Sequence, residues 1–243
     1  MLKLQARWAG ALCGVAAAAL AACDDGASIE EPVIPESVDL AVCAPDRGPF
    51  TVDIDNPYFP LPVGRELVLE GEDEEGVLVR VELEVLDVTE EIAGVTIRVV
   101  AAEEFEDGEL IETVRDFYAQ APDGTVCYYG EDVNQIEDGE IIGHEGAWRA
   151  GENGNLPGII MPGSPRPGTQ FPQERAPGVA EDMSAVVAVG VPVTVPAASF
   201  ADTAYLLDWN PLEGDTILDG EAKVYARGVG LVVDDFARLV SQQ

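Results

Sequence analysis

Apolar and polar residues alternate along much of the chain after its first fifty residues. Over residues 77–85 the odd-numbered positions are all Val or Leu, whereas Arg80, Glu82 and Glu84 lie between them. The segment VTIRVV at 95–100 repeats the alternation. Because successive side chains of a strand point to opposite faces of a sheet, this pattern predicts strands with one buried and one solvated face.

Turn sequences separate these segments at regular intervals. The dipeptides at 75–76, 93–94, 107–108, 123–124 and 138–139 all end in Gly, and the last three are Asp-Gly. Asp-Gly is typical of two-residue hairpin turns, in which both central residues have positive φ. The spacing leaves no room for crossover helices, so consecutive strands should pair antiparallel. We expect an all-β fold, a single antiparallel meander over residues 49–243 with a strongly curved sheet that forms a half-barrel or a sandwich.

Residues 150–178 interrupt this pattern. The segment is rich in Pro and Gly, which prevent long regular elements. We expect a long surface loop in which the apolar residues 158–161, GIIM, pack back against the sheet.

The first 22 residues have the pattern of a secretory signal peptide. Lys3 and Arg7 precede an apolar segment that is short for a membrane-spanning helix and ends in small residues. The sequence Leu-Ala-Ala-Cys at 20–23 resembles the lipobox of bacterial lipoproteins. This resemblance implies cleavage before Cys23 and attachment of acyl chains to it, so that the membrane is a partner through a lipid anchor. An ordinary secretory signal or an uncleaved anchor is the alternative.

Residues 23–48 are acidic and contain Pro, Gly and Ser, which favours a flexible tether between the lipidated cysteine and the folded domain. The expected location is the bacterial cell envelope, on the periplasmic face of the inner or outer membrane or at the cell surface.

The chain is strongly acidic, with 46 Asp and Glu against 13 Lys and Arg and a formal net charge of −33. Nucleic acid and anionic lipid surfaces would repel such a chain, so we expect no nucleic-acid partner. The charge fits solubility, cation binding, basic partners or a high-salt habitat.

The cysteines carry a second prediction. Cys13 falls in the signal peptide and Cys23 in the lipobox, which leaves Cys43 and Cys127 in a compartment where disulfides persist. We expect these two to form a disulfide with each other. A free thiol or a two-cysteine metal site is the alternative, although such a metal site would lack the usual further ligands.

Four segments together resemble a group of uncharacterised exported bacterial β-rich proteins. They are NPYFPLPVGRELVLEGE (56–72), DFYAQAPDGTVCYYGED (116–132), GAWRAGENGNLPGIIMPGSPRPG (146–168) and VYARGVGLVV (224–233). The resemblance implies export and a β-sheet domain, and it brings no catalytic residues. Cys127 stands where members of this group carry a tryptophan, which favours a disulfide particular to this chain.

Acidic residues gather between positions 131 and 138. Glu131, Asp132, Glu137 and Asp138 could supply oxygen ligands to a hard cation, so Ca²⁺ is the one cofactor that the sequence suggests. The spacing differs from that of an EF-hand loop, and so acidic a chain also places carboxylates at solvated turns. Both interpretations stay open.

Aromatic side chains offer another possible site. A carbohydrate or hydrophobic-ligand cleft could be lined by Trp148, Trp209, Tyr118, Tyr128, Tyr129 and Tyr225. Each of them lies in a predicted strand, where a packing role is more common.

No catalytic residues can be assigned. His144 is the only histidine, and no Gly-x-Ser-x-Gly sequence accompanies it, so we expect it at the surface or in a cross-strand contact. We expect a non-catalytic function, the binding of a hydrophobic ligand or of an envelope protein. The alternatives are a carboxylate-dependent envelope hydrolase and a cation-stabilised structural surface protein. A binding domain should enclose an apolar cavity without buried ionisable groups, whereas a hydrolase should hold two facing carboxylates, one with a shifted pKa.

Overall fold

The computed structural model describes residues 38–243, and within them one antiparallel sheet contains 14 strands. The strands are β1 (Glu66–Glu72), β2 (Leu78–Ile92), β3 (Val95–Glu106), β4 (Glu109–Gln120), β5 (Val126–Glu137), β6 (Glu140–Gly143), β7 (Trp148–Arg149), β8 (Gly158–Met161), β9 (Gln170–Pro172), β10 (Met183–Thr194), β11 (Ser199–Trp209), β12 (Glu221–Ala226), β13 (Gly230–Asp234) and β14 (Ala237–Gln242). Neighbours in the sheet follow chain order from β6 to β1 and from β14 to β9, and β1 pairs with β14. The predicted all-β meander is confirmed, and the sheet stays open at β6 and β9.

Helical structure in residues 38–243 is limited to four short 3₁₀ helices. These are η1 (Leu40–Cys43), η2 (Pro45–Arg47), η3 (Pro211–Glu213) and η4 (Ile217–Asp219). In this part of the chain no helix has the length and apolar character needed to cross a membrane.

The hairpin turns follow the Gly-containing dipeptides. Ala93-Gly94, Asp107-Gly108 and Asp138-Gly139 have positive φ at both residues, as two-residue hairpin turns require. At the other two dipeptides only Gly76 and Gly124 have positive φ. The turn prediction is therefore confirmed in full at three of the five positions.

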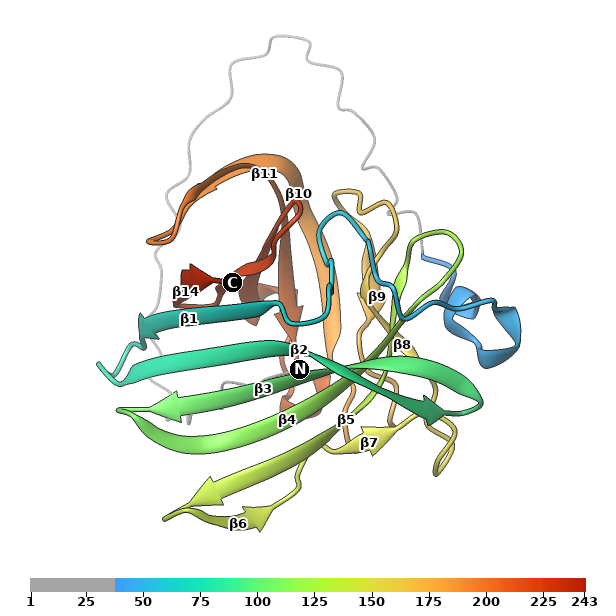
Figure 1. Ribbon diagram of the computed structural model, residues 1–243, viewed down its shortest axis with the longest axis horizontal. Helices are drawn as coiled ribbons and strands as arrows, with labels where there is room; N and C mark the ends of the chain where they lie inside the picture. The colour runs from blue at the N-terminus through green and yellow to red at the C-terminus, as the bar shows by residue number, and fades with distance from the viewer. Residues whose placement is uncertain (1–37) are drawn as a thin grey trace, which may run out of the picture.

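The sheet curves so that one face of its strands encloses an interior. Val85 of β2, Val100 of β3 and Asp116 of β4 are register partners and lie side by side on this face. In Figure 1 strands β1–β5 run side by side, and β10 and β11 run steeply across their direction. Strands from both halves of the meander therefore contribute to the enclosed interior.

Around β3 and β4 both faces of the sheet are covered, whereas the alternation predicts one buried and one solvated face. Ile97 and Phe117 point to the face opposite the enclosed interior and are fully buried, in one core cluster with Cys43 and Ile54 of the preceding segment. Arg98, expected on a solvated face, is 5% exposed and donates hydrogen bonds to backbone carbonyls, including that of Leu86. The reason is that residues 38–61 pack across β3–β5, a long-range contact that local alternation does not encode.

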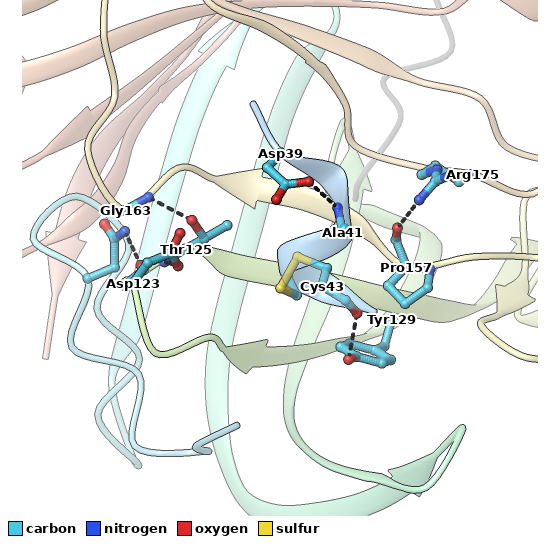
Figure 2. The surroundings of a disulfide bond; sticks show 12 residues. Asp39, Ala41, Cys43, Asp123, Thr125, Tyr129, Pro157, Gly163 and Arg175 are labelled. Carbon is cyan, nitrogen blue, oxygen red and sulfur yellow. Dashed lines mark hydrogen bonds between the residues drawn. A yellow bond between two sulfur atoms is a disulfide. The ribbon is translucent and has the colours of Figure 1, made fainter. Parts of the chain in front are cut away.

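Cys43 and Cys127 form a disulfide, as the cysteine count predicts. Figure 2 shows this bond beside the hydroxyl of Tyr129, which donates a hydrogen bond of 2.9 Å to the Cys43 carbonyl. Cys43 lies in η1 and is fully buried. Residues 40–47, placed by the sequence within the tether, thus belong to the folded part of the chain.

The Pro/Gly-rich segment 150–178 returns to the sheet twice. Strand β8, the predicted GIIM segment, pairs with β5, and β9 pairs with β10. At Gly158 a Cβ atom would lie 1.8 Å from the Gln173 carbonyl oxygen, so only glycine allows the backbone of β8 to approach residue 173 this closely. The proposed signal peptide, Cys23 and the tether up to residue 37 lie outside the described residues.

Candidate functional site

A cavity of about 70 Å³ lies on the inner face of the curved sheet. Its wall is mostly apolar and comes from β1–β4, β8, β12, β13 and the segment that precedes β1. The lining residues are Phe59, Pro60, Leu61, Arg65, Leu67, Val81, Leu83, Val85, Val100, Asp116, Tyr118, Ile160, Tyr225, Val229, Gly230, Leu231 and Asp234.

All four segments that carry the sequence resemblance meet at this cavity. The first supplies Phe59 and Leu61, the second Tyr118, the third Ile160 and the fourth Tyr225. These residues are as much as 166 positions apart in sequence order, between Phe59 and Tyr225. The segments therefore share a location in the fold that their separation along the chain conceals.

Aromatic rings form one side of the cavity. The ring of Phe59 lies edge-on to Tyr118 at 5.2 Å between centroids and tilted against Tyr225 at 5.8 Å. Tyr118 also stacks on Tyr128 at 5.0 Å. Such offset and edge contacts hold aromatic side chains in fixed orientations, so this side of the wall is preorganised.

The segment before β1 is tied to the turn between β12 and β13. The Arg65 guanidinium donates hydrogen bonds to the carbonyls of Gly228 (2.9 Å) and Val229 (2.6 Å). The hydroxyl of Tyr58 donates to Asp202 at 2.8 Å. These contacts fix Phe59 and its neighbours against the opposite half of the meander.

A buried group of carboxylates adjoins the cavity at Asp116. The Tyr128 hydroxyl oxygen lies 2.6 Å from Asp116 Oδ1 and 2.9 Å from Glu131 Oε2. A hydroxyl carries one proton and can donate to only one carboxylate, so the second contact requires a proton on a carboxyl group. Burial raises the pKa of Glu131 well above its usual value, and the nearby Glu174 and Asp116 carboxylates raise it further. Burial therefore favours Glu131 as the site of that proton.

A second buried polar group lies where β9, β10 and β11 adjoin. Five side-chain atoms of Gln173, Ser184 and Asp208 have no hydrogen-bond partner among the described residues. Burial raises the pKa of Asp208, while the charge of Lys223 and the polar side chains of Ser184 and Gln173 nearby lower it. Buried polar groups without a direct partner are usually bridged by ordered water.

The four residues proposed as calcium ligands are not brought together. Glu131 points into the interior, whereas Asp132, on the other face of β5, pairs with Arg149. Glu137 and Asp138 are exposed at the turn between β5 and β6. Within residues 38–243 no cluster of three or more Asp, Glu, His or Cys side chains is arranged to hold a metal ion.

The other sequence candidates are placed as follows. His144 is exposed, and its Nδ1 lies 2.8 Å from the Val133 carbonyl oxygen. Tyr118 and Tyr225 line the cavity, so two tyrosines expected to serve packing also face a potential ligand.

The sequence analysis did not identify Asp116 and Glu104 as buried acids. Their signal was present, because both occupy inward positions in the alternation of β3 and β4.

Comparison with known proteins gives little beyond this geometry. No family model matches the chain, and no curated protein matches it. Similar solved structures include a Bacteroides fragilis protein assigned as exported, with a YMCC-like fold, at 14% identity and a TM-score of 0.30 over 76% of this chain and 98% of that one. Another is a Parabacteroides distasonis protein assigned as a lipoprotein, at 12% identity and a TM-score of 0.35 over 77% of this chain and 99% of that one. Neither likeness is close enough to transfer a function to this chain.

Proposed function

We propose that this chain is an envelope lipoprotein whose β-domain binds a small hydrophobic ligand without catalysis. The observation that carries the proposal is the apolar cavity on the inner face of the sheet, lined mainly by aliphatic and aromatic side chains. Ligand sites are typically concave and mostly apolar, with a few polar groups that orient the ligand. The lipobox at 20–23 supports the location in the envelope. An envelope protein as the bound partner stays a prediction from the sequence.

The cavity departs from the expected binding site in one respect, since two buried carboxyl side chains, Asp116 and Asp234, form part of its wall. A volume of about 70 Å³ also limits the ligand. An apolar cavity of about 150 Å³ accommodates benzene, so a short alkyl chain or a similar small group is the size that fits without rearrangement.

Calorimetric titration of the detergent-free full chain with butan-1-ol, a short-chain alcohol smaller than benzene, tests this function. Saturable binding is expected for the natural chain. Leu83→Trp, which fills the cavity from β2, should abolish it, whereas Val88→Trp should not, because Val88 lies on the same strand but is 41% exposed and outside the cavity. No heat from the natural chain, or equal binding by both variants, would contradict the proposal.

A carboxylate-dependent hydrolase is the second candidate, and Asp116 and Glu131 favour it because both contact the Tyr128 hydroxyl. Glycosidases use such a pair, with one carboxyl protonated. The binding function is preferred because Asp116 lines the cavity and Glu131 does not. Turnover of aryl glycosides that is lost in both Asp116→Asn and Glu131→Gln would reverse this preference, and turnover unaffected by either variant would remove the candidate.

A further inference from the structure

Several polar groups interrupt the apolar wall of the cavity on its aromatic side. Tyr118 is 3% exposed and Tyr225 is 1% exposed, and both line the cavity. Neither hydroxyl has a hydrogen-bond partner within residues 38–243. The Asp116 carboxylate belongs to the same part of the wall. Both hydroxyl oxygens keep accessible surface, since neither is among the fully buried side-chain atoms that lack a partner, so each can form a hydrogen bond with a polar group of a ligand in the cavity.

The charges around the cavity decide the sign of that polar group. Two carboxyl side chains of the cavity wall, Asp116 and Asp234, are buried, at 4% and 3% exposed. Lys223 is also buried there and is engaged by Asp234. An anionic end would meet repulsion that low-dielectric surroundings strengthen, whereas a cation would be attracted.

The aromatic rings favour the same sign. Phe59, Tyr118 and Tyr225 all line the cavity. The ring centroid of Phe59 lies 5.2 Å from that of Tyr118 and 5.8 Å from that of Tyr225. Rings grouped in this way bind ammonium groups over their electron-rich faces, and a neighbouring carboxylate adds a charge-assisted hydrogen bond. Arg65, the cation of the wall, already donates to two backbone carbonyls at 2.9 and 2.6 Å.

We infer that the ligand is an amphiphilic amine, with its alkyl part on the aliphatic wall and its ammonium group held by Asp116, Tyr118 and Tyr225. This inference rests on the proposed binding function and adds the chemical class of the ligand. Fatty acids and phospholipid headgroups bearing only negative charge are excluded as preferred ligands, because they would place an anion beside Asp116.

The test compares three ligands of one chain length on the detergent-free full chain at neutral pH. Butylammonium should bind about tenfold or more tightly than butan-1-ol, and butanoate should bind more weakly than the alcohol. Asp116→Asn should bring the affinity ratio of amine to alcohol close to one. Asp132→Asn, a matched change on the outward face of the neighbouring strand β5, should leave the ratio as in the natural chain.

The outcomes separate the two proposals. If none of the three compounds binds, the proposed function fails and the present inference fails with it. If the alcohol binds and the amine binds no more tightly, only the inference on the amine is overturned. Butanoate that binds most tightly, and loses this advantage in Arg65→Gln, would assign an anionic ligand instead. The comparison on the natural chain decides the matter even if Asp116→Asn does not fold.

Discussion

Lys223 and Asp234 form an ion pair across β12 and β13, where they are register partners, and their side chains are 3% and 4% exposed. Lys223 is the only lysine after Lys3 in the chain. Removing two charges from water costs several kcal/mol per ion, and this pair can persist only because each charge offsets the other. It also places a charged pair at the cavity wall, since Asp234 is a lining residue.

Lys223→Met should therefore destabilise the domain by about 3–5 kcal/mol, because it leaves the Asp234 charge buried without its partner. Urea unfolding measures the loss. Arg80→Met is the control, since Arg80 pairs with Glu70 at the surface with its side chain 41% exposed, and the expected cost is about 1 kcal/mol or less. Lys223→Met combined with Asp234→Leu should regain most of the stability. Equal losses for Lys223→Met and Arg80→Met would contradict a buried pair.

Glu104 should make the domain less stable as the pH rises. Burial raises its pKa from 4.5 to about 8, and the charges of Glu112 and Glu106 add to the effect while Lys223 opposes it. Between pH 4.5 and about pH 8 the Glu104 side chain has released its proton in the unfolded chain and keeps it in the folded chain. The free energy of unfolding therefore falls by up to about 1.4 kcal/mol per pH unit, and the loss is complete above the higher value.

Urea unfolding of Glu104→Gln at a series of pH values checks this sign. The variant should lose less stability than the natural chain between pH 4.5 and 8. Glu103→Gln, one residue away on the exposed face of β3, should follow the natural chain. A Glu104→Gln profile parallel to the natural one would show that Glu104 titrates normally.

The disulfide should contribute strongly to stability, because Cys43 and Cys127 are 84 positions apart. The chain-entropy model gives about 4–5 kcal/mol for a loop of this length, as an upper bound. The double variant Cys43→Ser/Cys127→Ser should unfold at a correspondingly lower urea concentration. A reductant should lower the midpoint of the natural chain and leave that of the variant unchanged. Two reactive thiols at these positions in the unreduced, denatured protein would contradict the bond.

Local patterns were sufficient for the strands, the Asp-Gly turns and the disulfide, since each depends on neighbours in sequence or on compartment. The calcium grouping treated Glu131 and Asp132 as one site, although adjacent residues of a strand face opposite sides of the sheet. The cavity required long-range register, because β1 pairs with β14 and thereby brings Phe59 to Tyr225. No local sequence signal specifies the pairing of β1 with β14.

Tyr128 and Tyr129 are adjacent and fully buried. Replacing each by Phe compares the stability lost with a hydrogen bond to a charged acceptor with the stability lost with a hydrogen bond to a neutral one. The Tyr128 hydroxyl contacts the carboxyl groups of Asp116 and Glu131, whereas the Tyr129 hydroxyl donates to the Cys43 carbonyl. Hydrogen bonds to charged groups contribute about 1.5–3 kcal/mol and neutral ones about 1 kcal/mol. Tyr128→Phe should thus cost the larger amount in urea unfolding, and the cost should shrink as the pH rises, because Glu131 then loses the proton that the shared contact needs and the natural chain loses that contact as well. Equal, pH-independent costs for Tyr128→Phe and Tyr129→Phe would mean that Tyr128 bridges no ionisable pair.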